Sequence, residues 1–513
     1  MVTVRRSAPK SRHGCKTCKV RRVKCDENQP RCNRCVTTGR SCDGYTSESP
    51  TSSPASHSIA VNSMATSTQP TSRAYDLQKR RAFDFFRTET APKISGHFGA
   101  TTWQLILQTC SNEPVVSQAV VALGSLHERL SIASNEKGSQ AIATPFPMRQ
   151  YSQAISDLRE YLSTSWNADI NIILICALVH ISIETLQVKY SNAVLHLEHS
   201  LQLIQVVSGI STPSPSDAVA GPSFKQNIEP ELIDTFQGLD IHASLFQGMR
   251  PPILSGICTQ DSVPGRLSSL REAHLVLNRI TSRLYTFIRS VVEEYKHRKL
   301  QVIPIEEIAE AASIVSEFEA WDDRFQRYLH RTTSKFSRAD QSVIDILLVN
   351  HRLAFIEAST CVYSDATIFD KFDAPFDEIV TLASNVIRAR KPTSVLDFQL
   401  DIGIIQPLYR TALCCREPWT RQKAISLLRS ITFQEGVWNA ASQAAIAQVA
   451  IDRENYFKDE NNPSRRVSEF GRVHTVGIDV IDFVKKTAEV ILSQKLNGLD
   501  GPWYEHVEFC TWK

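Results

Sequence analysis

Six cysteines between residues 15 and 42 constrain this chain more than any other feature of its sequence. Their spacing, C-x2-C-x6-C-x6-C-x2-C-x6-C, divides the stretch into two similar halves. A C-x2-C pair lets two thiolates bind one ion from a single turn, and structural zinc takes four ligands in a tetrahedron. Two zinc ions therefore need eight ligand positions, which six thiolates fill if two of them bridge both ions. The repeat suggests one bridge in each half. The ligands are Cys15, Cys18, Cys25, Cys32, Cys35 and Cys42.

The remaining cysteines do not indicate a disulfide scaffold. Of 13 cysteines, the seven outside the cluster are scattered without a repeated spacing, and no secretory apolar segment follows the basic start of the chain. We therefore expect a reducing, intracellular setting, where such spacing indicates metal binding. The longest apolar run, residues 170–183, is too short for a membrane span and is typical of a buried helix. We expect no membrane partner.

Charge is distributed unevenly along the 513 residues. Residues 1–45 hold 12 Lys and Arg against 3 Asp and Glu, a balance of +9. The rest of the chain holds 45 against 51, a balance of −6, so the overall value of +3 hides the asymmetry. A compact basic segment on a mildly acidic body is typical of a nucleic-acid-binding protein.

The cysteine stretch resembles the fungal binuclear zinc-cluster family of DNA-binding proteins, the Zn(2)-C6 fungal type. The shared features are the six cysteines, the basic run that ends in Lys24-Cys25-Asp26, and Pro30 between the halves. The resemblance implies two zinc ions per chain, bridged by the first and fourth cysteines, Cys15 and Cys32. It also implies a transcription regulator that binds double-stranded DNA in the nucleus.

The same resemblance assigns roles to the basic residues. The family reads bases from a short helix after the second cysteine, which corresponds to residues 17–24 here and places Arg21 and Arg22 in the reading positions. The family most often has lysine at the second of these positions. An arginine side chain donates two hydrogen bonds to guanine O6 and N7, so we expect a triplet such as CGG. The residues expected to contact phosphate are Lys19, Lys24, Arg31 and Arg34.

Composition divides the chain into four segments. Residues 1–14 form a basic tail, which carries a nuclear import signal, contacts phosphate or does both, and residues 15–42 form the cluster. In residues 46–72, Ser, Thr and Pro fill 17 of 27 positions, which predicts a disordered linker. That linker has no leucine and no heptad, so we expect a monomer, or a dimer through the helical body, rather than a coiled-coil dimer. Residues 75–513 form the body.

The body shows helical periodicity over most of its length. Pro92 is expected to end the first helix close to that residue. The stripe of Phe83, Phe85 and Phe86 is interpreted as core rather than as a stacking platform. Further helices are predicted over residues 113–130, 148–162, 169–186, 190–207, 268–297, 305–329, 341–363, 377–390 and 421–431.

Alternation near the C-terminus predicts a small antiparallel sheet from residues 472–480, 489–495 and 503–512. Three stretches resemble one subgroup of zinc-cluster regulators, whose helical body is regulatory: the run RAFDFFRTETAPKISG, the long run from Asn171 to Ile204 that ends in HLEHSLQLI, and the tail from Gly501 to Trp512. The expected fold is therefore mainly α, with an N-terminal zinc cluster, a flexible linker and a helical body that ends in a small antiparallel sheet.

Three other groups of residues were weighed as sites. His196 and His199 do not have the spacing of a zinc protease motif, and helix packing is favoured. Cys414 and Cys415 are favoured as buried packing over a redox pair. The acidic segment 305–323 is favoured as the solvated face of a packed helix over a segment that recruits transcription machinery. We find no enzyme constellation.

Two classes of function remain from the sequence. The first is a sequence-specific transcription factor of RNA polymerase II genes, with transcription machinery as a partner and with control of a metabolic or secondary-metabolite pathway suggested by the resemblance. The alternative is a zinc-stapled module that binds RNA or protein on a helical scaffold. The Arg and Lys run between the second and third cysteines favours the first.

Overall fold

The computed structural model places the chain in two compact units, residues 1–69 and 70–513, which we describe separately. The structure describes residues 14–21, 23–44, 72–135, 145–164, 168–209, 227–248, 250–255, 264–292, 303–332, 336–391, 393–458, 466–499 and 501–512. The predicted basic tail up to residue 13 and most of the predicted linker lie outside these residues, as does Arg22.

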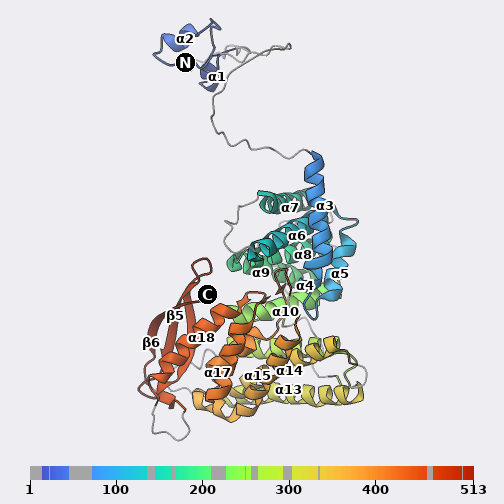
Figure 1. Ribbon diagram of the computed structural model, residues 1–513, viewed down its shortest axis with the longest axis vertical. Helices are drawn as coiled ribbons and strands as arrows, with labels where there is room; N and C mark the ends of the chain where they lie inside the picture. The colour runs from blue at the N-terminus through green and yellow to red at the C-terminus, as the bar shows by residue number, and fades with distance from the viewer. Residues whose placement is uncertain are drawn as a thin grey trace, which may run out of the picture. The chain divides into compact units, whose positions relative to one another are not determined.

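The first unit contains two short helices that repeat the same local geometry (Figure 1). Helix α1 spans Lys16–Val20 and helix α2 spans Asn33–Val36. Each begins at a cysteine whose sulfur accepts a backbone N–H from the next cysteine of its C-x2-C pair. The sulfur thus takes the place of the oxygen that usually caps a helix N-terminus.

Helices build nearly all of the second unit (Figure 1). Its first part contains α3 Ser72–Phe85, the π-helical turn η1 Phe86–Thr90, α4 Ala91–Ile94, α5 Ala100–Thr109, α6 Pro114–Asn135, α7 Pro145–Thr164, α8 Ile170–Leu186, α9 Tyr190–Val207 and α10 Pro230–Gln247. The second part contains α11 Leu270–Phe287, the π-helical turn η3 Ile288–Val292, α13 Ile305–Thr332, α14 Arg338–Thr360, η5 Ala366–Phe372, α15 Asp373–Ala389, α16 Ile405–Cys414, α17 Pro418–Ser430, α18 Ala440–Asn455 and η6 Glu469–Gly471.

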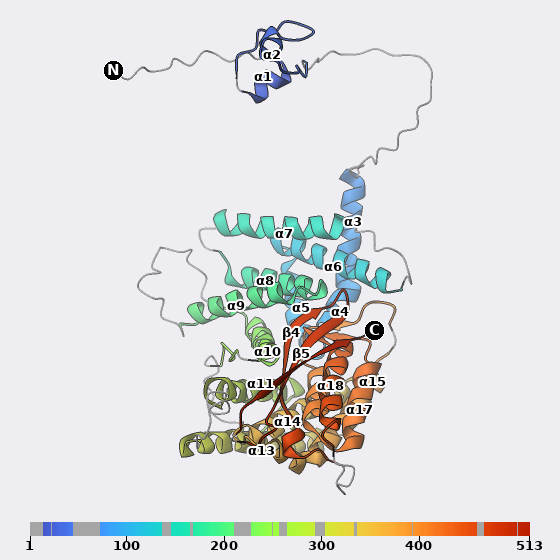
Figure 2. The same ribbon diagram turned by 90° about the vertical axis from the view of Figure 1, so that its left-hand side faces the viewer.

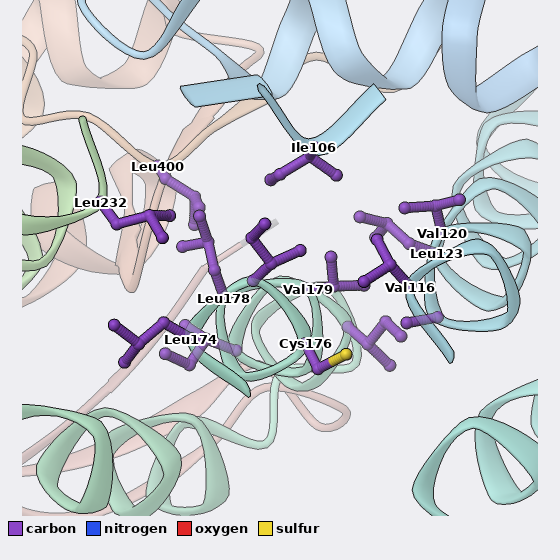
Figure 3. Packing of buried hydrophobic residues seen from close by; sticks show 14 of the residues in the cluster. Ile106, Val116, Val120, Leu123, Leu174, Cys176, Leu178, Val179, Leu232 and Leu400 are labelled. Carbon is purple, nitrogen blue, oxygen red and sulfur yellow. The ribbon is translucent and has the colours of Figure 1, made fainter. Parts of the chain in front are cut away.

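Helix α8 forms the centre of the first hydrophobic core. Its sequence INIILICALVHISIETL is apolar on every side, and residues from Ile170 to Leu186 are buried around most of its circumference. Figure 3 shows Leu174, Cys176, Leu178 and Val179 of α8 among side chains of α5, α6 and α10. A helix that is apolar all round is stable only when neighbours cover all of it, so α8 organises this half of the body.

Two more cores complete the body. One lies among α14 to α18 and includes Trp438 and Ile446, and the other joins α11, α13 and α14 around Trp321 and Phe325. On α13 the buried residues recur at helical spacing, with Ile314, Phe318, Trp321 and Phe325 among them, while Glu306, Glu319 and Asp323 are exposed. The acidic segment is therefore the solvated face of a packed helix, as the sequence indicated.

Two small sheets accompany the helices. The C-terminal sheet has the order β4-β5-β6 with antiparallel pairs and consists of β4 Val473–Asp482, β5 Thr487–Gln494 and β6 Tyr504–Thr511. Alternate residues of β5, Ala488, Val490 and Leu492, point into the second core, and Figure 2 shows the sheet in front of α18. A second sheet joins β1 Phe398–Gln399, β2 Gln434–Glu435 and β3 Trp438–Asn439.

The predicted fold class is confirmed: a cysteine cluster precedes a mainly α body with a small antiparallel sheet near its C-terminus. Helix α9 has the predicted bounds, and the other predicted helices appear with shifted ends. In the described part of the chain, four α-helices of six residues or more were not predicted, α5, α10, α16 and α18, and neither was the 3-10 helix η5. The aromatic stripe is core, since Phe86 is fully buried and Phe83 packs against the same cluster.

The prediction that Pro92 ends the first helix is wrong. The helical path continues through η1 and α4 to Ile94. The wider turns of η1 change the hydrogen-bond register, so Pro92 falls in the first turn of α4. A proline inside an α-helix clashes with the carbonyl of residue i−4, and the π-helical turn before Pro92 alters that spacing.

Candidate metal centre and nucleic-acid interface

The two C-x2-C pairs bring four sulfur atoms together. Cys15 Sγ lies 3.5 Å from Cys32 Sγ and 3.9 Å from Cys35 Sγ. Cys18 Sγ lies 3.7 Å from Cys32 Sγ and 3.8 Å from Cys35 Sγ. Two thiolates bound to one tetrahedral zinc at about 2.3 Å stand about 3.8 Å apart, so these separations suit sulfurs that share an ion.

Backbone N–H groups repeat the same pattern in each half of the cluster. The N–H of Cys15 points at Cys25 Sγ at 3.4 Å, and the N–H of Cys32 points at Cys42 Sγ at 3.5 Å. The third cysteine of each half is thereby brought back beside the first. Donation to sulfur stabilises the thiolate form, which is the form that binds zinc.

Burial opposes charge on these sulfurs when no cation is near. It raises the pKa of the thiols of Cys15, Cys18 and Cys32 above their usual value. The pKa of Cys42 is lowered, chiefly because its sulfur accepts the N–H of Cys32. A buried group of thiols that resists ionisation is stabilised as thiolates by a bound divalent cation, and the donor set therefore fits zinc.

One acidic side chain also lies beside the cluster. An oxygen of Asp26, Cys25 Sγ and Cys32 Sγ lie within 4.8 Å of one another. Asp26 is exposed, and the sequence analysis gave it no ligand role. Among the described residues, the groups that could hold a metal all belong to this unit.

The predicted reading helix is shorter than expected. Helix α1 ends at Val20 with Arg21 as its C-cap, so the expected extension to Lys24 is wrong. The chain leaves the helix because Cys25 must return to the N–H of Cys15, 10 residues earlier. Cys18 lies in α1, whereas Cys25 lies in the segment that follows it. Metal ligation by these two cysteines would therefore hold the helix and the segment after it, rather than the two ends of one helix.

The predicted phosphate-contacting side chains are all exposed. Lys19 lies on α1 and Lys24 follows it, while Arg31 precedes α2 and Arg34 lies on it. Arg21 is half-buried, and its Nη1 donates to Thr38 Oγ1 at 3.4 Å. The other predicted base-reading residue, Arg22, lies outside the described residues.

Polar contacts that were not predicted from the sequence join the start of α1 to the segment after Cys42. Thr17 Oγ1 donates to Asp43 Oδ2 at 2.8 Å, and the N–H of Asp43 donates to Thr17 Oγ1 at 3.0 Å. The backbone N–H of Lys16 also donates to the carbonyl of Gly44 at 3.0 Å. The segment after the last cysteine is thus tied to the start of α1. No local pattern signals a pair 26 residues apart.

Of the pair His196 and His199, His196 is half-buried and packs against α8, whereas His199 is exposed. The ring of His196 stands 5.8 Å from that of His180 on α8, and burial lowers the pKa of both imidazoles. Cys414 and Cys415 are buried in the second core and are not joined to each other. Within the described part of the chain, no helix combines the length and apolar character needed to cross a membrane.

Comparison with known proteins connects both units to one family. The family model described as the fungal Zn(2)-Cys(6) binuclear cluster domain matches residues 13–52. The fungal specific transcription factor domain matches residues 81–442, which is more than half of the chain. This chain belongs to the fungal Zn(2)-Cys(6) transcription factors. Its cluster binds two zinc ions through cysteine thiolates, and its family consists of DNA-binding transcription regulators, which are not a class of enzymes.

Several curated proteins resemble the chain. The aspercryptin biosynthesis cluster-specific transcription regulator atnN of Emericella nidulans is 23% identical over 66% of this chain and 58% of its own length. The transcription regulator lscL of Purpureocillium lilacinum is 28% identical over 36% of this chain and 47% of its own length. A Zn(2)-C6 fungal-type transcription factor of Gibberella zeae is 56% identical over 39 residues, 8% of each chain.

The matches to the first two relatives thus span about half of those relatives' lengths. No solved structure matches the chain.

Proposed function

We propose that this chain is a sequence-specific transcription factor of RNA polymerase II genes that reads CGG-like triplets in the major groove of DNA. The observation that carries the proposal is the basic surface built on a rigid cluster. Cysteine sulfurs and the contacts of Thr17 hold α1 in place, while Lys19 and Lys24 remain exposed. A preorganised helix loses little conformational entropy when it binds DNA.

Each basic residue has a proposed role in that complex. Arg21 and Arg22 read guanine through paired hydrogen bonds to O6 and N7. The side chain of Arg21 leaves Thr38 to do so, which is a small change because that contact is long, at 3.4 Å. Contacts to phosphate fix the register without specifying sequence, and they come from Lys19, Lys24, Arg31 and Arg34.

The cysteines have unequal proposed roles in the cluster. Cys15 and Cys32 bridge the two zinc ions, because their sulfurs are 3.5 Å apart and each lies close to a sulfur of the other half. The full proposed ligand set is Cys15, Cys18, Cys25, Cys32, Cys35 and Cys42.

The remaining segments complete the proposed regulator. The domains are a basic tail at residues 1–14, the cluster at 15–42, a linker at 46–72 and a regulatory body at 75–513. The protein acts in the nucleus, where the body recruits transcription machinery as a monomer or as a dimer held by the body. Since the relative atnN is named as a cluster-specific regulator of aspercryptin biosynthesis, we extend the proposal to genes of a secondary-metabolite pathway.

Titration of the full chain on CGG and scrambled duplexes at several salt concentrations tests this function. Arg22→Ala should weaken binding to CGG by about 1–3 kcal/mol and relax the base preference. Lys24→Ala should weaken both duplexes alike and reduce the slope of log K against log salt by roughly one. Equal losses on both duplexes for Arg22→Ala would refute base reading, and preference for single strands would favour an RNA-binding module.

A further inference from the structure

Strand β6 is a regular edge strand of the C-terminal sheet. It pairs with β5 without a break in register from Thr487↔Thr511 to Gln494↔Tyr504. The opposite edge strand, β4, has two register shifts, and such irregularities discourage pairing with another chain. β6 contains neither lysine nor proline, which protect many edges, but it carries the charged residues Glu505 and Glu508, which restrict what can pair with it. Among the described residues, β5 is the one strand that pairs with it.

The outer face of this sheet carries exposed apolar side chains among polar ones. Val507 is 46% exposed and Phe509 is 73% exposed on β6. Val480 of β4, Glu489 of β5 and Phe509 stand in one row across the three strands. Figure 2 shows this face of the sheet turned away from α17 and α18, which lie behind it. Large apolar side chains on an exposed face beside a free edge are typical of an interaction surface.

We propose that β6 docks against β6 of a second copy of this chain, antiparallel and around a two-fold axis at Val507. In an antiparallel pair, opposite residues point to the same face of the sheet. A two-fold axis between two identical strands must therefore lie midway between the two copies of one residue, which stand opposite each other. An axis at Val507 or at Glu508 pairs nearly the whole strand. An axis at Glu508 places two like charges directly opposite each other, which destabilises a sheet.

The axis at Val507 gives complementary pairs instead. His506 faces Glu508 of the second copy, and Glu508 faces His506 of the second copy. In one chain His506 Nε2 and Glu508 Oε1 already lie 2.8 Å apart, and their side chains are 41% and 44% exposed, so both remain accessible. On the open face Val507 meets Val507 of the second copy, and Phe509 packs on the aliphatic part of its Glu505. The charge pattern of β6 therefore selects a second copy as its occupant.

This inference supplies a surface for the body-mediated dimer in the proposed function, and it does not depend on DNA reading. The two sheets would join into one continuous sheet, which removes both free β6 edges. Because the dimer is closed by the two-fold axis, pairing stops at two chains.

Disulfide crosslinking of the zinc-loaded full chain without DNA tests the register. Val507→Cys should form an intermolecular disulfide with itself under mild oxidation, because the two copies of residue 507 are opposite each other. Val484→Cys is the matched control, since Val484 is 94% exposed but lies on the turn between β4 and β5. If Val507→Cys gives no more dimer on a non-reducing gel than Val484→Cys, or less than Glu508→Cys, the proposed pairing is wrong.

Sedimentation equilibrium tests the charge pairs. Glu508→Lys should weaken self-association by about tenfold, because two favourable pairs become two repulsive ones. The double variant His506→Glu with Glu508→His should restore it, since the same pairs form in reverse. A wild-type chain that remains monomeric at its highest soluble concentration would overturn the proposal. A chain that fails to recognise CGG but still crosslinks at residue 507 would refute only the DNA-reading proposal.

Discussion

Among single residues, Cys15 and Cys42 occupy unequal places in the cluster. Cys15 is fully buried and its sulfur contacts those of Cys32 and Cys35, whereas Cys42 is partly exposed. If Cys15 bridges both ions, Cys15→Ala should release both, while Cys42→Ala should leave one zinc ion bound. Metal analysis of the two purified variants, beside a wild-type value of two per chain, checks this. Equal stoichiometries in the two variants would contradict the bridging role.

Glu454 is a buried charged residue of the body with two buried partners. Its oxygens accept from Arg416 at 2.7 Å and from Arg421 at 2.6 Å, and all three side chains are buried. Burial alone would raise the pKa of Glu454, but the two guanidinium groups outweigh it and lower the pKa to about 2. Glu454→Gln leaves two buried cations without a counter-charge, so it should cost about 3–5 kcal/mol of unfolding free energy.

Urea unfolding followed by tryptophan fluorescence measures that cost, since all seven tryptophans lie beyond residue 100 and report on the body. Asp323→Asn is the control, because its ion pair with Arg327 is exposed and should change stability by less than about 0.5 kcal/mol.

The lowered pKa of Glu454 also predicts the pH range in which its contribution to stability is lost. The contribution of Glu454 should be complete above its usual pKa of 4.5 and should be lost as the pH falls toward 2. A loss between pH 6 and 8 would contradict this assignment.

Sequence reasoning found the cysteines but could not find this triad. The six cysteines repeat at short spacing, so their chemistry is visible in one local stretch. Glu454 lies 38 residues from Arg416 and 33 from Arg421. Intervals of this length correspond to no helix or strand periodicity, so the sequence does not reveal the contact. Their contact arises only when α17 and α18 pack together. The same holds for Thr17 and Asp43 at the cluster.

Among secondary-structure elements, the two glycines inside α6 and α10 have opposite expected effects. A Cβ on Gly124 of α6 would stand 2.3 Å from the carbonyl oxygen of Ala82 in α3, whereas one on Gly238 of α10 would meet nothing within 4 Å. Gly124→Ala should therefore separate α3 from α6 and cost about 1–3 kcal/mol. Gly238→Ala should stabilise the body by about 0.5–1 kcal/mol, because alanine restricts the unfolded chain and favours helix. Thermal unfolding of both variants checks the two signs, and a stable Gly124→Ala variant would exclude a tight contact.

The helices that sequence reasoning found and missed differ in pattern. Helix α9 alternates buried residues such as Leu197, Leu201 and Ile204 with exposed ones, so its periodicity was visible. Helix α18, AASQAAIAQVAIDREN, is rich in alanine and buried on several sides, which leaves no clear apolar face. The end of α1 at Val20 could not be predicted either, since it depends on where Cys25 must return.

For the whole molecule, the two units have different sources of stability. The body contains three extended apolar cores, and the C-terminal strands belong to one of them through Val473, Ala488 and Cys510. In the described part of the first unit, the buried cluster consists of cysteines alone. Structural zinc typically supplies on the order of 10 kcal/mol or more of folding free energy to such a small unit.

Removal of zinc should therefore unfold the first unit and spare the body. A strong chelator added to the full chain should abolish binding to CGG duplexes and release two zinc ions, while tryptophan fluorescence and most of the helical circular dichroism stay unchanged. The spectroscopic signal separates the units because the cluster region contains no tryptophan and α1 and α2 are short. Subsequent heating should still give a cooperative transition of the body, at the temperature seen with zinc present. A melting temperature that falls with chelation would show that the body depends on the cluster, and the division into two independently stable units would be wrong.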